Sequence, residues 1–164
     1  MPPTDSLIFK VAQANEIEEL LDYETKKLAE TVVDENDRAI EAWHAKWRRE
    51  ALEHYLPNGW CFIARNPNQA SSFSKDGLIV GYFLAQPLLF FEGLTQSLWI
   101  EHLQYSSLQA RDGLVDLAYR LSREKHFQKV YFPNTQLISN SVRQIRGEAW
   151  VPQVLHVTTS KMNS

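Results

Sequence analysis

Apolar and polar positions follow two periods along the chain, and their order predicts a mixed α/β fold. Residues 98–105 alternate as in a β-strand, whereas leucines recur at helical spacing over residues 111–125. Residues 129–132 return to strand chemistry. The pattern therefore predicts a strand, a helix and a second strand, with the helix lying on the sheet between two parallel strands.

The same two periods assign the rest of the chain. The other predicted elements are a strand at 7–12, helices containing residues 17–28 and 40–55, strands at 60–65 and 78–85, a helix from 133–134 to Gly147, and a last strand at 151–159. The polar residues 66–77 join their flanking strands as an antiparallel hairpin. The order is βααβββαβαβ, an α/β (α+β) fold with a mixed central sheet, and we expect one domain over residues 1–164.

The first two predicted helices carry further local signals. Asn15 and Glu18 have the spacing of a capping box at the start of the first helix. The second helix has its apolar residues three or four apart, which predicts one wide aromatic face; they are Ile40, Trp43, Trp47, Ala51 and Tyr55. Its cationic face fits either a patch for nucleic acid or an acidic partner, or a solvated face balanced by glutamates. The solvated face is the favoured interpretation.

Pro87 interrupts the most apolar run of the chain. Because proline cannot donate a ladder hydrogen bond, we expect it to end or bend the strand at 78–85 and to leave 88–91 as an edge segment or loop. Phe90 and Phe91 then line a substrate opening or a dimer contact, or pack against the two early helices. The packed arrangement is slightly favoured.

Composition narrows the classes of function. The net charge of −3 gives no global field for nucleic acid or an anionic membrane, so neither partner is expected. The single cysteine, Cys61, excludes an internal disulfide, and the five histidines lack paired spacing, so no metal site is expected. The N-terminus has no basic start before an apolar region, which makes a cytoplasmic protein the default expectation.

Residues 99–105, WIEHLQY, resemble the fourth strand of the GNAT family, the Gcn5-related N-acetyltransferases. In that comparison Glu101 takes the acidic position, and Leu103 and Tyr105 take the positions whose backbone pairs with the pantetheine arm of acetyl-CoA. The predicted order of elements is also the GNAT order. The resemblance implies a GNAT fold over nearly the whole chain.

The family follows this strand with Arg/Gln-x-x-Gly-x-Gly/Ala, a loop whose backbone amides bind the pyrophosphate of the cofactor. One register places Gln109, Asp112 and Leu114 at these positions, and only Gln109 matches. The carboxylate of Asp112 and the bulk of Leu114 count against tight cofactor binding. Shifting the motif by one residue places Arg111 at its first position and Gly113 at a glycine position. In this register, a cationic loop that binds phosphate in another way than the family's backbone amides stays possible.

The resemblance also suggests residues for catalysis. Glu101 is the best candidate for the catalytic base, because strand alternation places it on the same face as Trp99, Leu103 and Tyr105. A structural role, as an exposed or salt-bridged glutamate of the strand, is supported equally. His102 alternates to the opposite face, where a core histidine with a hydrogen-bond partner is expected.

The helix after the fifth strand often begins with Asn in the family and carries a Tyr near the thiol. Asn134 matches the first position, but no tyrosine lies between Asn134 and Gly147, so the usual general acid is missing. Tyr105 and Tyr119 are the alternative hydroxyls, although the position of Tyr119 on the predicted helix favours a core or surface role.

These residues lead to two main hypotheses of function. The first is an acyl-CoA-dependent N-acyltransferase that uses acetyl-CoA or another acyl-CoA and modifies a small-molecule amine or a protein amine. The second is a catalytically silent GNAT-like module that binds a small molecule or a protein through the same cleft. A weaker third is an interaction domain that uses Phe90, Phe91 and the second helix. A homodimer is compatible with each of them.

Overall fold

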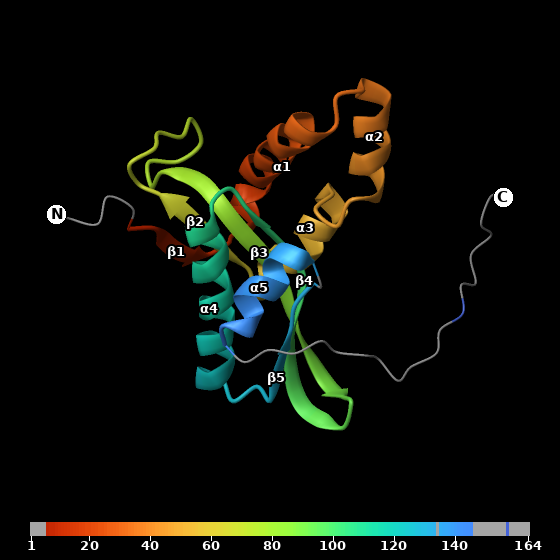
Figure 1. The fold of residues 1–164 in the computed structure, drawn as a ribbon, viewed down its shortest axis with the longest axis vertical. Coiled ribbons are helices and arrows are strands. Elements are labelled where there is room, and N and C mark those ends of the chain that lie inside the picture. Colours follow the sequence, from red (N-terminus) through yellow and green to blue (C-terminus); the bar gives the residue numbers. More distant parts are fainter. Residues whose placement is uncertain (1–5, 134, 146–156, 158–164) are drawn as a thin grey trace.

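The computed structural model describes residues 6–133, 135–145 and 157 (Figure 1). One mixed sheet runs in the order β1-β2-β3-β4-β5. The elements are β1 (Ile8–Val11), α1 (Ile17–Thr31), α2 (Glu35–His44), α3 (Arg49–Tyr55), β2 (Phe62–Asn66), β3 (Leu78–Phe91), β4 (Leu94–Tyr105), α4 (Leu108–Glu124), β5 (Lys129–Tyr131) and α5 (Gln136–Arg143). Short 3₁₀ turns at Ala14–Glu16 and Leu56–Asn58 precede α1 and follow α3. Along the described ranges, no helix has the length and apolar run needed to cross a bilayer.

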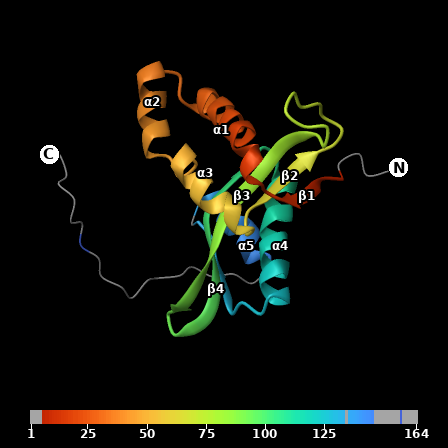
Figure 2. The ribbon, with the colours of Figure 1, turned by 180° about the vertical axis from the view of Figure 1, so that it is seen from behind.

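The sheet separates two hydrophobic cores. Helices α4 and α5 cover one face, and α1 and α3 pack on the other (Figures 1 and 2). The first core is centred on Phe83, Leu98, Ile100 and Leu114. The second contains Leu20, Leu52, Tyr82 and Leu84. Burial on both faces explains why β3 reads as a nearly continuous apolar run.

The predicted mixed α/β fold and its parallel crossover are confirmed. Strands β1 to β4 are antiparallel neighbours, whereas β4 pairs with β5 in parallel through Ser97–Trp99 and Lys129–Tyr131. Helix α4 connects these two strands, and its Leu114 and Ala118 are fully buried against the sheet. The predicted last strand at 151–159 lies outside the described residues, apart from Val157, which is in no strand.

The prediction of one continuous second helix is wrong. The chain leaves helical geometry at Ala45, whose φ of −69° and ψ of 145° are extended, and α3 begins only at Arg49. The break divides the expected aromatic face. Trp47 is partly buried and packs against the second core, whereas Ile40 and Trp43 are 59% and 72% exposed on α2.

Pro87 does not end β3, because the edge it faces carries no partner strand. The N–H and C=O of Ala85 point to Cys61, on the β2 side of β3. The backbone N and C=O of Pro87, two residues later, are directed to the same side of β3. The ladder between β2 and β3 has already ended there, at the pair Phe62 and Phe83. The missing N–H therefore costs no ladder bond, and β3 continues to Phe91.

Two smaller predictions also need correction. Phe91 packs edge-on against Trp99 and Tyr131, and Phe90 is 77% exposed, so neither phenylalanine packs against the early helices. The capping box before α1 is formed by Gln13 and Glu16, with the Gln13 N–H donating to Glu16 Oε1 over 2.8 Å. The Ala14–Glu16 turn thereby takes the place that the sequence assigned to the first helical turn.

Candidate functional site

A β-bulge at Glu101 sets the geometry of β4. Leu84 pairs with His102, but Ala85 pairs with Ile100, so Glu101 is an extra residue on β4. The bulge shifts the alternation that the sequence predicted. Leu103 joins Ile100 in the core under α4, whereas Glu101 and His102 both make their contacts on the face covered by α1 and α3. The expected grouping of Glu101 with Leu103 is therefore wrong.

Beyond Trp99, the outer edge of β4 has no partner strand among the described residues, because the β5 ladder ends there. The N–H of Ser106 donates to Val80 on the β3 side, so Tyr105 turns its backbone to the outer edge, where its N–H donates to Gln104 Oε1 over 3.2 Å. An open groove of about 480 Å³ follows this edge. It is lined by Lys27, Leu103, Gln104, Tyr105, Thr135, Leu137 and Ile138.

Helix α4 begins beside this groove after a connection of only two residues. Ser107 caps the helix, accepting a hydrogen bond from the N–H of Ala110 on its Oγ over 3.1 Å. The Oγ of Ser106 lies 2.8 Å from the hydroxyl of Tyr23 on α1. Gln109, predicted to contact the cofactor, lies exposed in the first turn of α4. The positive end of the α4 dipole is thus close to the open edge of β4.

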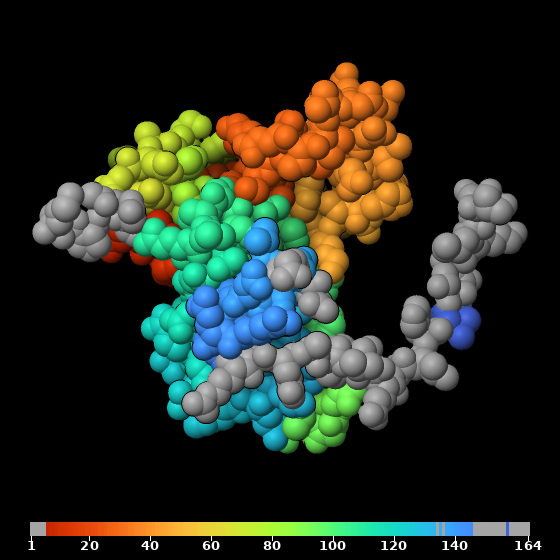
Figure 3. Space-filling model, viewed as in Figure 1, coloured from red at the N-terminus to blue at the C-terminus, as the bar shows by residue number. Residues whose placement is uncertain are grey.

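Arg111 and Asp112 connect α4 to α5. The Arg111 side chain is buried, and its guanidinium donates to the carbonyl oxygen of Leu137 over 3.0 Å and to Asp112 Oδ1 over 2.9 Å. Asp112 Oδ1 also accepts the hydroxyl of Ser141 over 2.8 Å. Helix α5 thereby lies against α4 on the face shown in Figure 3. These contacts occupy two side chains that the sequence placed near phosphate.

Gly113 and Leu114 face inward from the second turn of α4. A Cβ at Gly113 would lie 2.5 Å from Phe9 Cζ, so the glycine allows β1 and α4 to approach closely. Leu114 is fully buried, and its Cδ1 lies over Gly81 of β3. Asn134, the remaining predicted cofactor residue, lies outside the described residues.

Glu101, at the bulge of β4, is held by two donors. The indole N–H of Trp99 donates to its Oε2 over 2.7 Å, and the Lys46 ammonium lies 3.7 Å from Oε1. The side chain of Glu101 is 28% exposed. Burial, followed by the nearby Glu101 charge, raises the pKa of Tyr55 on α3. Glu101 is therefore a partly exposed carboxylate between β4 and the α2–α3 connection.

A buried carboxylate that the sequence analysis missed lies next to this position. Glu24 of α1 is 2% exposed and accepts the hydroxyl of Tyr82 on Oε1 over 2.7 Å. His102 Nε2 lies 2.8 Å from the same oxygen, and Gln104 Nε2 donates to Oε2 over 3.3 Å. Burial and the Glu24 charge raise the pKa of Tyr82 well above its usual value. The available signal was the spacing of Glu24, four residues after Leu20 on the buried face of α1.

A small cleft opens next to Glu24 on the α1–α3 side. It has a volume of about 190 Å³ and is lined by Glu24, Lys27, Leu28, Thr31, Trp47 and Gln104. Gln104 also lines the groove on the outer edge of β4. The cleft and the groove therefore approach the same part of β4 from its two sides. The expectation that His102 is a core histidine with a partner fits its contact with Glu24.

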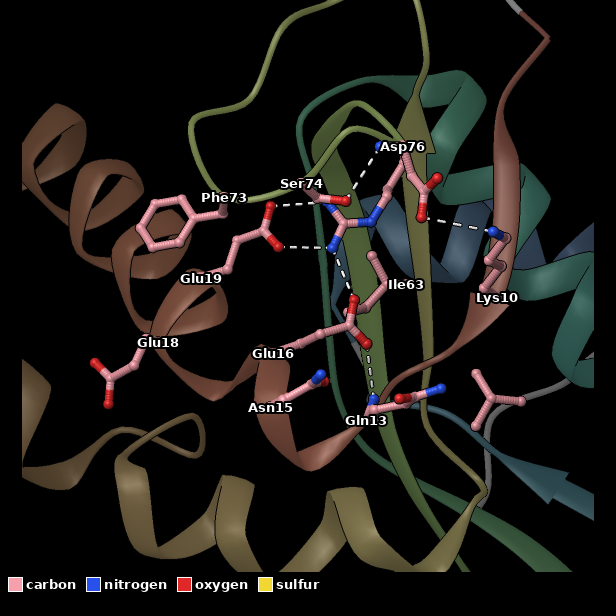
Figure 4. Close-up of a pocket in the computed structure, with 12 residues that line it drawn as sticks. Lys10, Gln13, Asn15, Glu16, Glu18, Glu19, Ile63, Phe73, Ser74 and Asp76 are labelled. Atoms are coloured by element: carbon pink, nitrogen blue, oxygen red, sulfur yellow. Dashed lines mark hydrogen bonds and ion pairs between the residues drawn. The ribbon is translucent and has the colours of Figure 1, made fainter.

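A separate pocket of about 440 Å³ lies away from this region, between β1, α1 and the loop of residues 66–77 (Figure 4). Its central charge is Arg65, which is 4% exposed and bonded to Glu19, to Glu16 and to the carbonyl oxygen of Gly77. Ser71 of the loop donates to Glu19 as well. This network joins the loop to α1 and β2, so we assign it a structural role.

Comparisons with known proteins find similarity in structure rather than in sequence. The chain matches no protein-family profile and no curated protein sequence. A predicted acetyltransferase with acetyl-CoA from Clostridium acetobutylicum is 13% identical over 93% of this chain and 96% of that one, with a TM-score of 0.60.

Two further crystal structures have similar scores. A ribosomal-protein-alanine N-acetyltransferase from Brucella melitensis is 16% identical over 93% of this chain and 100% of that one, with a TM-score of 0.54. An aminoglycoside acetyltransferase from an uncultured soil metagenomic sample is 15% identical over 95% and 97%, with a TM-score of 0.52. An agmatine N-acetyltransferase is also similar. At these identities the likeness defines the fold.

Proposed function

We propose that this chain, which has the GNAT fold, is an acyl-CoA-dependent N-acyltransferase that transfers an acetyl group to a small-molecule amine. One observation carries the proposal. Among the described residues, the outer edge of β4 is open beyond Trp99, and its backbone runs from the bulge at Glu101 to the capped start of α4. Such an edge offers backbone groups to an extended ligand that carries amides.

The chemistry of the groove lining supports binding of the arm of acetyl-CoA there. The backbone of Leu103 and Tyr105 would pair with the amides of the arm, while Leu137 and Ile138 of α5 supply an apolar wall. The N–H of Tyr105 is held by Gln104 Oε1 at 3.2 Å, a contact that a ligand carbonyl could replace. Bound there, acetyl-CoA would supply an acetyl thioester that an unprotonated amine can attack.

The phosphate end of the ligand would lie at the start of α4. The helix dipole and the exposed first turn around Gln109 favour an anion there, and Lys27 adds a cationic group at the groove. Arg111 and Asp112 act on this site indirectly, because their bonds to α5 fix the second wall of the groove. Gly113 and Leu114 set the distance of α4 from the sheet in the same way.

The acceptor amine would enter from the α1–α3 side of β4. Glu101 supplies a carboxylate that attracts the ammonium group of the acceptor, and Trp47 supplies an aromatic wall in the neighbouring cleft. An agmatine N-acetyltransferase and an aminoglycoside acetyltransferase share this fold. A cationic small-molecule amine therefore fits the charges at this opening.

Acetyl transfer from acetyl-CoA can be measured by mass spectrometry with agmatine, kanamycin and a lysine-containing peptide as acceptors. We expect an acetylated product with at least one of the two small amines. Glu101→Gln should lower kcat/KM about ten- to ten-thousand-fold. Glu124→Gln, at the far end of α4, serves as the control and should behave as the wild type. Equal kcat/KM values in the wild type and Glu101→Gln would remove Glu101 from the proposed mechanism.

The silent binding module remains the second candidate because of one specific observation. Only Ser106 and Ser107 separate β4 from α4, and Arg111, Asp112 and Leu114 already have partners in the fold. This arrangement leaves few backbone amides for a pyrophosphate. A wild-type protein that binds acetyl-CoA or free CoA but acetylates none of the three acceptors would favour the module.

A further inference from the structure

The contact between Glu24 and His102 joins α1 to the bulged part of β4. The Nε2 atom of His102 lies 2.8 Å from Glu24 Oε1, and the carboxylate is 2% exposed. The His102 side chain itself is 18% exposed. The buried carboxylate of Glu24 is thus in hydrogen-bond contact with one ring nitrogen of His102, while part of the imidazole is exposed to solvent.

The surrounding donors determine which ring nitrogen carries the proton. Tyr82 keeps its proton because burial and Glu24 raise its pKa well above the usual value, and its hydroxyl donates to Glu24. Gln104 donates to the other carboxylate oxygen. Because a carboxylate only accepts hydrogen bonds, neutral His102 must donate from Nε2. Its Nδ1 then carries the lone pair, and within the described residues no hydrogen bond reaches that atom.

The bulge places this imidazole next to Glu101 on the same side of the sheet. In a regular strand, adjacent side chains would point to opposite faces. Here Glu101 meets Trp99 and Lys46, while His102 meets Glu24, and all these partners lie on the α1–α3 side. The amine that Glu101 attracts would therefore lie close to His102.

We propose that His102 is the catalytic base for the acceptor amine and that Glu24 is its positioning residue. This inference rests on the proposed N-acyltransferase function. The proton of the ammonium group passes to Nδ1 of His102, which leaves a neutral amine and an imidazolium. Glu24 then stabilises the imidazolium through Nε2–H, and the imidazolium later returns its proton to solvent. Glu101 holds the ammonium form before this transfer.

The charged and titratable groups around His102 come from four parts of the structure. They are Glu24 and Lys27 of α1, Tyr82 of β3, Glu101 of β4, and Lys46 with Tyr55 from the α2–α3 region. Lys46 is already paired with Glu101. Glu24 is therefore the only carboxylate among the described residues that contacts the imidazole.

Kinetics with acetyl-CoA and the better of agmatine and kanamycin separate these roles. His102→Gln keeps an amide donor for Glu24 but has no base, so kcat should fall about 100- to 10,000-fold, and the pH dependence of kcat that the base produces should disappear. Glu24→Gln should lower kcat by about tenfold or more. Glu101→Gln should chiefly raise KM for the amine. His126→Asn, at the exposed end of α4, is the control and should match the wild type in every measurement.

Nitrogen-15 NMR of the histidine rings gives a readout that needs no turnover. In the wild type above pH 8, His102 should carry its proton on Nε2 and leave Nδ1 unprotonated. Addition of agmatine or kanamycin without acetyl-CoA should shift the Nδ1 resonance. In Glu24→Gln, the preference for the Nε2–H form should decrease. A ring protonated on Nδ1 would overturn the proposal even if acetyl transfer occurs.

Different results would contradict the N-acyltransferase function and the role of His102. If wild type acetylates none of the acceptors, the N-acyltransferase function fails, and the inference fails with it. If wild type acetylates an amine and His102→Gln keeps both kcat and the pH profile, only the role of His102 is wrong. A folded His102→Gln protein, checked by thermal unfolding, with reduced kcat and a flat pH profile would support the base. If His102→Gln does not fold, His102→Asn replaces it under the same criteria.

Discussion

The guanidinium of Arg111 lies 3.0 Å from the carbonyl oxygen of Leu137, and this hydrogen bond joins the second turn of α4 to α5. The same guanidinium bonds Asp112, whose carboxylate accepts the hydroxyl of Ser141. The three side chains hold the wall of the groove that faces β4. Their first role is therefore structural, whatever ligand the groove binds.

Replacement of Arg111 should reduce stability. Arg111→Leu leaves the Leu137 carbonyl and Asp112 without their buried donor, so the free energy of unfolding in urea should fall by about 1–3 kcal/mol. Arg120→Leu removes an exposed pair with Asp116 on the same helix and should cost less than about 1 kcal/mol. If Arg111→Leu were as stable as the control but bound acetyl-CoA much more weakly, Arg111 would be a phosphate ligand instead.

The buried ion pair of Arg65 and Glu19 should contribute far more to stability than the exposed ion pair of Arg49 and the neighbouring Glu18. The contacts of Arg65 with Glu19, of 2.6 and 2.7 Å, are buried, and Arg65→Leu would leave Glu19 as a buried charge without its main partner. We expect a loss of about 3–5 kcal/mol in urea unfolding. The exposed pair of Arg49 and Glu18 gives the control, Arg49→Leu, with a loss below about 1 kcal/mol. Equal losses in the two variants would contradict the structural assignment of this pocket.

Gly113→Ala should destabilise the protein even though alanine favours helices. The substitution alone would add about 1 kcal/mol of helix propensity. The new Cβ would, however, lie 2.5 Å from Phe9 Cζ, which forces the ring or the helix to move and costs about 1–3 kcal/mol. Phe9→Leu removes the atom that clashes. The double variant should therefore lose less unfolding free energy than the two single variants lose in sum. Simple additivity of the losses would count against this contact.

Cys61 should react slowly with thiol reagents in the native state. Burial raises the pKa of its thiol from 9.0 to about 11, so the thiolate fraction at pH 8 falls about a hundredfold relative to the unfolded chain. Because the chain has one cysteine, labelling with Ellman's reagent follows this residue alone. Rapid labelling of native protein at the rate measured in urea would contradict the burial of Cys61.

The same shift in pKa predicts a loss of stability at high pH. The folded state binds the thiol proton more tightly than the unfolded state does. The corresponding stability is therefore complete below about pH 9 and is lost as the pH rises toward about 11. Over this range, the wild type should lose about 1–3 kcal/mol of unfolding free energy relative to Cys61→Ala. An unchanged difference would contradict the assigned pKa.

Local periodicity was sufficient to predict the crossover from β4 through α4 to β5. Leu114 and Leu117 of α4 face the sheet, and the strands on either side have short, clear patterns, so the parallel arrangement followed. Pro87 misled the prediction because a sequence does not reveal which edge of a strand lacks a partner. The break at Ala45 was hidden for a related reason, since Ile40 and Trp43 continue the apolar spacing although they remain exposed.

The candidate site was predicted only in part. The strand that contains Glu101 was predicted from the alternation of residues 98–105, whereas pairing of the Leu103 and Tyr105 backbone with an acyl-CoA arm came from the family resemblance and stays a prediction. The bulge was not predicted, because one extra residue in β4 becomes visible only from its pairing with Leu84 and Ala85 of β3. The contact of Glu24 with His102 joins residues 78 positions apart and depends on how α1 packs on the sheet.

The most direct test of the account is calorimetric titration of the protein with acetyl-CoA. The groove beside β4 predicts saturable binding of one acetyl-CoA per chain, with competition by free CoA. Leu137→Trp fills this groove from its partly exposed wall and should weaken binding about tenfold or more, a loss of about 1.4 kcal/mol. Leu89→Trp, on the exposed part of β3, should bind as the wild type does. No saturable heat at millimolar acetyl-CoA, or equal affinity in wild type and Leu137→Trp, would contradict an acyl-CoA site in this groove.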